Sequence, residues 1–447
     1  MARINLCFVW HMHQPFYKDL ATGMYRLPWT RLHALKDYYG MVKILEGFPN
    51  VHQTFNLVPS MIVQIEEYAA GKAADPFLDC AIRPADDLNE AEREFVLRYF
   101  FQANAGRMIY RYPRYGELFD AWKRAGENPR RVRAIFSAQD IRDLQVLSQL
   151  AWFDEEFQAH DEEVKRLLAK ERNYSLDDQA LMARKQREIL AAVVPVYKEF
   201  ASRGQIEIST TPFYHPILPL VCDSNIASVS HPGVPLPNRF HYPQDARWQL
   251  QSAREFIERE FGQAPAGLWP SEGSVSDEAL AISAEVGFRW AASDNGVLAQ
   301  TLHKTAGPDL TYKSYLWRQD DHQLRMIFRD HFLSDLIGFV YSKMSAEEAA
   351  GHFLDRIRAN TQSFGGDVLV PIILDGENAW EYFYYNGRPF LRELYRRIGE
   401  SSDLAALTVT EALERDDPRT IDHIFPGSWI NANFDVWIGA AEDNRAW

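Results

Sequence analysis

AGLWPSEGSVSDEALAISAEVGFRWAASD, residues 266–294, contains the alternation that decides the fold. A short apolar run ends at Glu272, a helix is predicted from about Ser276 to Gly287, and a second apolar run ends at Asp294. Glycine is common just beyond a helix end because it adopts the left-handed conformation without strain. The stretch therefore predicts a compact β-α-β unit with its two strands in parallel.

The same alternation continues on both sides of this unit. Further strands are predicted at residues 4–10, 204–209 and 325–330, and the strongest at 368–374. That last run, Val-Leu-Val-Pro-Ile-Ile-Leu, leads directly into Asp375. Alternating strands and helices favour a parallel α/β barrel, complete or incomplete, with a doubly wound open sheet as the alternative.

A long helical region interrupts the predicted strands at about residues 60–203. Asn89 with Glu92 resembles a capping box ahead of an apolar periodic run, and Gly204 is a plausible stop for the final helix. We interpret this region as a helical insertion into the sheet domain.

Composition excludes several classes of function. There are 48 Lys and Arg against 62 Asp and Glu, a formal charge of −14, which disfavours nucleic acid and suits a neutral substrate. No apolar stretch is long enough to span a membrane, and the N-terminal run lacks a secretory cleavage site. Cys7, Cys80 and Cys222 are far apart, which is typical of reduced thiols in a cytoplasmic protein.

Polar residues follow the predicted strands at the points where the strands end. In barrel enzymes the active site lies at the carboxyl ends of the strands, so these side chains are expected to converge. They are His11, His13, His215, Glu272, Asp294, Asp330 with His331, and Asp375.

Two of these residues suit glycoside hydrolysis. Such a reaction needs one carboxylate that attacks the anomeric carbon or activates water, and a second that protonates the leaving oxygen. Asp375, at the end of a buried strand where desolvation raises a pKa, fits the second role, and Glu272 is the other candidate carboxylate. Glu377 is a rival for Asp375, and we interpret it as supporting the loop.

His11 and His13 are expected to point the same way from an extended strand end. They suit hydrogen bonds to sugar hydroxyls, structural packing, or a metal site shared with Asp294 or Asp330. The metal reading implies a metal-dependent deacetylase or mannosidase, and a non-catalytic sugar-binding protein is a third possibility.

Five short regions, in order along the chain, resemble the signature regions of glycoside hydrolase family 57. This is the family of amylopullulanases, α-amylases, 4-α-glucanotransferases and branching enzymes. The amino-acid sequences of the third and fifth of these regions are most similar to those of the amylopullulanase and α-amylase branch. The regions are His13-Gln-Pro15, Gly204-Gln-Ile-Glu-Ile208, Leu268-Trp-Pro-Ser-Glu272, Leu374-Asp-Gly-Glu-Asn378 and Ser428-Trp-Ile-Asn-Ala-Asn-Phe-Asp-Val-Trp437.

The resemblance implies an incomplete (β/α)7 barrel over residues 1–385 and a helical C-terminal region, 386–447, that closes the cleft. It also implies that α-glucans are cleaved with retention by Glu272 as nucleophile and Asp375 as general acid/base, without metal or cofactor. A 4-α-glucanotransferase or branching enzyme would use the same site. No nucleic acid or membrane partner is expected, and the oligomeric state is open. The residues expected to bind substrate are His11, His13, Glu207, His215, Trp269, Asp294, Trp380, Trp429 and Asp435.

Overall fold

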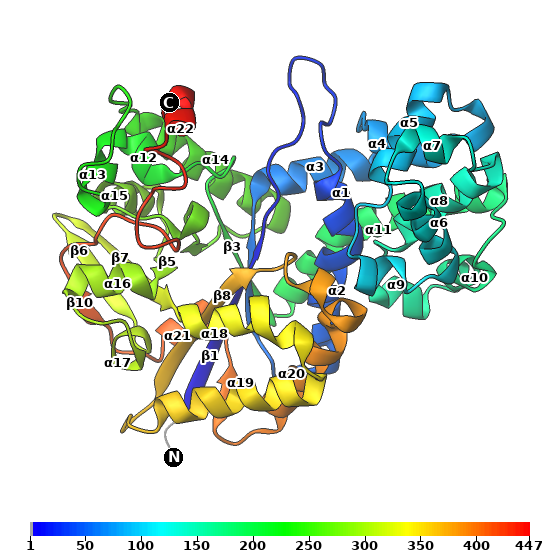
Figure 1. Ribbon diagram of the computed structural model, residues 1–447. Helices are drawn as coiled ribbons and strands as arrows, with labels where there is room; N and C mark the ends of the chain where they lie inside the picture. Colours follow the sequence, from blue (N-terminus) through cyan, green and yellow to red (C-terminus); the bar gives the residue numbers. More distant parts are fainter. Residues whose placement is uncertain (1–2) are drawn as a thin grey trace.

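The computed structural model describes residues 3–447, and its centre is a mostly parallel β-sheet surrounded by helices (Figure 1). Seven parallel strands follow one another in the order β7-β5-β4-β3-β2-β1-β8. The α/β class predicted from the sequence is confirmed. The strands are β1 (Ile4–Met12), β2 (Gln53–Leu57), β3 (Ile206–Thr210), β4 (Gly267–Leu268), β5 (Trp290–Asp294), β7 (His322–Arg329) and β8 (Val368–Asp375).

The two ends of this row, β7 and β8, approach each other without forming a ladder. The backbone N–H of Asp330, just past β7, donates to the carbonyl of Pro371 in β8 at 2.9 Å. A residue in a strand points its N–H and its C=O to the same side, so the N–H that Pro371 lacks would also face β7. Proline is tolerated within a sheet where no ladder bond is required. This explains how so apolar a strand accommodates it.

Three further strands extend the sheet. β6 (Tyr315–Gln319) forms an antiparallel hairpin with β7, and β10 (Arg419–Ile421) pairs with β6. β9 (Leu404–Ala406) pairs with the first three residues of β1, while β2 pairs with its last four. The region 386–447, expected to be helical, also contains β9 and β10, which the sequence did not reveal because strands of three residues are too short for a periodic signal.

Helices fill the whole interval between the adjacent strands β2 and β3. They form the lobe on the right of Figure 1 and share one large apolar core with β1, β2 and β8. The helices are α3 (Pro59–Ala69), α4 (Pro76–Ile82), α5 (Glu90–Tyr99), α6 (Pro113–Arg124), α7 (Pro129–Arg133), α8 (Ala138–Leu150), α9 (Glu155–His160), α10 (Glu162–Lys170) and α11 (Leu176–Ser202).

The remaining helices lie between the other strands and after β8. Among residues 3–447, none of the helices has the length and apolar character needed to cross a membrane. They are α1 (Trp29–His33), α2 (Tyr39–Lys43), α12 (Leu218–Cys222), α13 (Ala227–Ser230), α14 (Pro243–Phe261), α15 (Asp277–Val286), α16 (Asn295–Leu302), α17 (Pro308–Thr311), α18 (His331–Asp335), α19 (Ala346–Thr361), α20 (Arg388–Glu400), α21 (Val409–Leu413) and α22 (Ala441–Ala446).

The β-α-β unit predicted at 266–294 is confirmed as β4, α15 and β5. The Ser276 side chain accepts a hydrogen bond from Ala279 N at the start of α15, and Gly287 ends the helix with φ +103°. Because β4 and β5 pair in parallel, both carboxyl ends reach the same edge of the sheet.

Candidate active site

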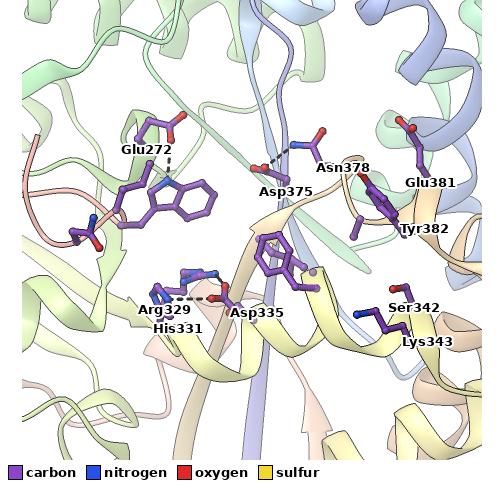
Figure 2. Close-up of a pocket in the computed structure, with 18 residues that line it drawn as sticks. Glu272, Arg329, His331, Asp335, Ser342, Lys343, Asp375, Asn378, Glu381 and Tyr382 are labelled. Carbon is purple, nitrogen blue, oxygen red and sulfur yellow. Dashed lines mark hydrogen bonds and ion pairs between the residues drawn. The ribbon is translucent and has the colours of Figure 1, made fainter. Parts of the chain in front are cut away.

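A cavity of about 910 Å³ opens at the carboxyl ends of β4, β7 and β8 (Figure 2). Its volume lies within the range of small-molecule sites. Both carboxylates singled out from the sequence line it, so residues 103 positions apart meet at one site. The lining residues are Glu272, Arg329, His331, Ser334, Asp335, Gly338, Phe339, Ser342, Lys343, Leu374, Asp375, Asn378, Ala379, Glu381, Tyr382, Trp429, Ile430 and Asn431.

Glu272 lies just beyond β4 in an unusual backbone conformation. Its φ is +58° and ψ is 25°, in the left-handed region that non-glycine residues rarely adopt. Trp429 secures it twice, since the backbone N–H donates to the Glu272 carbonyl at 3.0 Å and the indole Nε1 donates to Oε2 at 2.8 Å. Burial raises the pKa of Glu272, the bond from Trp429 opposes that shift, and the charge of Asp375 raises the pKa further.

Asp375 is the last residue of β8 and lies opposite His11 in the β1–β8 register. Asn378 Nδ2 donates to its Oδ2 at 2.8 Å. Burial raises the pKa of Asp375, while the Asn378 bond and the positive charge of Arg329 oppose this shift. A carboxyl group with a raised pKa keeps its proton nearer to neutral pH, as a general acid requires.

A cluster of charged residues forms the cavity wall below Glu272, and Figure 2 shows three of them, Arg329 of β7 and His331 and Asp335 of α18. Arg329 Nη1 donates to Asp294 Oδ2 at 3.2 Å, and Arg329 Nη2 donates to Asp335 Oδ1 at 2.5 Å. Its guanidinium lies 5.3 Å from the ring centroid of Trp429, a cation–π arrangement. The side chain that binds Glu272 is thus itself supported by Arg329.

His331 completes this cluster and faces the cavity. Its two ring nitrogens lie 3.2 Å from Asp294 and 3.1 Å from Asp335. Hydrogen bonds that the ring donates to these carboxylates raise the pKa of His331 to about 9, which makes the ring a cation at neutral pH.

Aromatic and polar side chains from the segments after α18 and after β8 form the other wall of the cavity, and the sequence analysis did not single them out. Phe339 is 73% exposed and Tyr382 is 59% exposed, unusual for rings of this size. Lys343 and Glu381 also lie at this wall (Figure 2). The only sequence signal was the aromatic density of residues 380–385.

His11, His13 and His215 form a stack beside Asp375. The rings of His13 and His215 lie 3.8 Å apart, and each lies 5.2 Å from the ring of His11. His215 has φ +58°, a strained conformation that accompanies its place in the stack. The three residues therefore lie together, as the sequence predicted, whereas their role in substrate binding stays a prediction.

The state of His11 follows from its neighbour Asn56. The Asn56 Nδ2 donates to the Thr210 carbonyl, so its Oδ1 accepts from His11 Nδ1 at 2.7 Å. Nε2 of His11 is then an unprotonated acceptor, and it is buried without a partner. Burial lowers the pKa of His11 to about 4 and that of His13 to about 3, so both rings are neutral.

Within residues 3–447, these three histidines are the group that could hold a metal, because one nitrogen from each lies within 4.8 Å of the others. The arrangement fits an ion poorly. The ring planes are within 23° of parallel, and lone pairs that lie in stacked parallel planes do not converge on one point. Asp294 and Asp330 do not join the histidines. Asp294 binds Arg329 and His331, and Asp330 accepts from Tyr312 OH at 2.7 Å.

The structure places the other predicted binding residues as follows. Trp429 lines the cavity. Trp269 and Trp380 do not line it; both are fully buried, and Trp380 packs on Trp10. A tryptophan near a strand end is as suited to the core as to a sugar, and the sequence does not separate the two uses.

Glu207 and Asp435 also lie away from the cavity. The Glu207 carboxylate accepts from Trp290 Nε1 at 2.9 Å and from Thr410 at 2.7 Å, near the start of β3. Asp435 borders a separate hollow of about 310 Å³ between residues 231–235 and 438–440.

Glu377 supports the loop after β1. Its Oε1 accepts from His13 N at 3.1 Å, from Gln14 at 3.2 Å and from Tyr38 OH at 3.2 Å, and burial raises its pKa well above the usual value.

Comparison with known proteins identifies relatives. The family model described as glycosyl hydrolase family 57 matches residues 7–425. A search of curated protein sequences finds no match.

Similar solved structures share the fold at low sequence identity. An alpha-amylase from Thermotoga maritima is 12% identical, with a TM-score of 0.58 over 96% of this chain and 78% of that one. A branching enzyme of the same family from Thermococcus kodakaraensis, solved with glucose, is 14% identical, with a TM-score of 0.59 over 99% and 77%. A 4-alpha-glucanotransferase from Thermococcus litoralis is 15% identical, with a TM-score of 0.54 over 96% and 43%.

Proposed function

The chain belongs to glycosyl hydrolase family 57, and from this membership we propose that it cleaves α-glucans by a retaining double displacement. Glu272 is the nucleophile and Asp375 the general acid/base. The observation that carries the proposal is the shared cavity, because glycoside hydrolysis needs two carboxyl groups beside one bond and β4 and β8 each deliver one.

The first displacement forms a covalent glycosyl-enzyme. An Oε of Glu272 attacks the anomeric carbon while Asp375 gives its proton to the departing glycosidic oxygen. In the second displacement Asp375, now ionised, takes a proton from water that attacks the same carbon, and the bond from that carbon to Glu272 breaks. A sugar hydroxyl in place of water makes the enzyme a transferase.

The surroundings support this assignment of roles. The indole of Trp429 donates to Glu272 and stabilises its ionised form, which a nucleophile requires. Asp375 ends a strand whose preceding seven residues are all buried, and this desolvation favours its protonated form.

The test replaces Glu272 by Gln. Turnover of maltoheptaose should fall by about 10³-fold or more, while maltooligosaccharide binding stays within a few-fold. Glu381→Gln removes another carboxylate from the same cavity and should keep turnover within about tenfold of wild type. Near-wild-type turnover by Glu272→Gln would reject the assignment.

Product analysis decides between hydrolysis and transfer. Glucose and short maltooligosaccharides from maltoheptaose indicate hydrolysis, and products longer than the substrate indicate a 4-α-glucanotransferase or branching activity. Pullulan tests whether α-1,6 bonds are cut in addition to α-1,4 bonds.

The proximity of three histidine nitrogens is the one observation behind an alternative function, a metal-dependent deacetylase or mannosidase. That enzyme would bind one equivalent of Zn²⁺ through His11, His13 and His215 and would lose activity when a chelator removes it. Parallel rings argue against this reading, and calorimetric titration of Zn²⁺ into the protein tests it independently of activity.

A further inference from the structure

Three aromatic side chains, Phe16, Tyr214 and Trp248, gather at the surface outside the cavity. We call them the aromatic patch. Tyr214 is 44% exposed and Trp248 is 54% exposed. Their ring planes lie within 13° of each other with centroids 6.4 Å apart, and Phe16 meets Tyr214 edge-on at 5.3 Å. Contiguous exposed rings of this kind mark binding surfaces more often than isolated ones.

The patch is held rigidly from below. Tyr214 N donates to the Gln249 side chain at 2.8 Å, and Phe213 N donates to the Gln249 carbonyl at 3.2 Å. Phe213 packs on Phe256 of α14 at 5.6 Å, so the loop after β3 is fixed to the helix that carries Trp248. A preorganised surface loses less entropy when a ligand binds.

The patch begins next to the histidine stack. Tyr214 directly precedes His215, and Phe16 stands three residues after His13. None of the three rings lines the cavity that holds Glu272 and Asp375. A polymer that extends from the catalytic carboxyl groups past the histidine stack would meet these rings.

The local charge suits a neutral polymer. Arg247, next to Trp248, is paired with Glu285, so the patch presents no free cation there. A polyanion such as a nucleic acid, which also stacks on rings, would meet a chain of net charge −14. Pyranose rings have apolar C–H faces that lie against aromatic faces, and their hydroxyls stay in water.

We propose that Tyr214 and Trp248 form a binding site for an α-glucan chain, outside the catalytic cavity. The proposal rests on the proposed function, since it names the same class of polymer. The site holds long substrates during repeated cleavage, and it is not needed for short ones.

The experiment compares Trp248→Ala with wild type, with Trp248→Phe to keep a ring and Tyr110→Ala as control. Tyr110 is 45% exposed, a similar value, but lies in the helical lobe. Electrophoresis in native gels that contain glycogen measures binding. The apparent dissociation constant should rise about tenfold for Trp248→Ala, the equivalent of one lost stacking contact. It should stay within twofold for Tyr110→Ala and lie between these for Trp248→Phe.

Kinetics on two substrates completes the test. For Trp248→Ala, kcat/KM should fall about tenfold on amylose and stay within twofold on maltotriose. Unchanged migration in glycogen, or equal losses on both substrates, would overturn the proposal. A wild type that glycogen does not retard would also overturn it, and so would a change of oligomeric state in Trp248→Ala. Retardation that depends on Trp248, without release of sugar from any substrate, would leave the patch standing and reject the catalytic proposal.

Discussion

The two carboxyl groups of the cavity are held by opposite means. Asp375 ends an eight-residue strand, β8, that pairs with β1 over its whole length. Glu272 follows a strand of two residues, β4, and sits in a left-handed turn tied to Trp429, a residue 157 positions further along the chain. The register of the central sheet fixes one group, and a strained turn with a remote partner fixes the other.

The difference predicts different sensitivities. Substitutions that leave the sheet intact should leave Asp375 in place. Glu272 depends on its own backbone, on the neighbouring glycine and on a C-terminal segment that contributes no strand at that point. Substitutions far from the cavity should therefore displace the Glu272 side chain more readily than the Asp375 side chain.

The largest effect on activity should come from removing either carboxyl group. Glu272→Ala and Asp375→Ala should each lose about 10³-fold or more in kcat. Azide should then rescue them with opposite stereochemistry, because azide replaces the carboxylate in Glu272→Ala and the water in Asp375→Ala. NMR of the products should show a β-glycosyl azide from the first variant and an α-glycosyl azide from the second.

A reversed pattern of azide products would exchange the two assignments. Asn431→Ala, a non-ionisable change in the same cavity, should show no rescue by azide and serves as the control.

Next in size is the backbone beside Glu272. Gly273 has φ +59°, and a Cβ there would lie 2.8 Å from the Trp269 ring. Gly273→Ala should lower the free energy of unfolding by about 2–4 kcal/mol, since left-handed strain and overpacking add. Gly233 has φ +81° with no atom within 4 Å of a Cβ, so Gly233→Ala should cost about 1–2 kcal/mol. Urea unfolding of both variants measures the two losses of unfolding free energy. Equal losses would show that the Trp269 ring moves aside at no cost in Gly273→Ala.

The sequence revealed the Asp375 side of the cavity well, because a long apolar strand is a strong periodic signal. It missed β2 altogether. Gln53, Thr54 and Asn56 are polar but fully buried, and their partners, such as Trp10 Nε1 at 2.7 Å from Gln53 Oε1, come from other strands. Hydrophobic patterns do not register polar groups whose hydrogen bonds are satisfied by residues remote in sequence.

Side-chain parity explains a second miss. The strand predicted at 325–330 is observed as β7, and of the two residues named beyond it, Asp330 and His331, only His331 lines the cavity, while Arg329 was not named. Successive side chains of a strand point in opposite directions, so Arg329 faces the cavity while Asp330 turns to Tyr312 and caps α18. Which of these two residues faces the cavity depends on how β7 is aligned with its neighbouring strands, and a single sequence does not define that alignment.

The third prediction, with a smaller expected effect, concerns the hydrogen bond from Trp429 to Glu272. Trp429→Phe removes a donor to a charged oxygen and should lower kcat/KM by about 10- to 100-fold. Loss of that donor raises the pKa of Glu272, and the nucleophile must be ionised. The acidic limb of the pH–rate profile should therefore move to higher pH, while the basic limb moves less. An unmoved acidic limb would mean that the Trp429 bond does not tune Glu272.

The smallest effect should come from Asn378, the matching donor on the other side. Its bond to Asp375 is exposed to water, so Asn378→Ala should change kcat/KM by about two- to fivefold. The bond favours the ionised form, and its loss raises the pKa of Asp375, which must be protonated in the first step. The basic limb should then move to higher pH and widen the profile, whereas Trp429→Phe narrows it from the acidic side. Because two coupled carboxyl groups titrate as a pair, the limbs are compared between variants measured in the same buffers. If both variants shifted the same limb of the pH–rate profile, Glu272 and Asp375 would not have the separate roles of nucleophile and general acid/base.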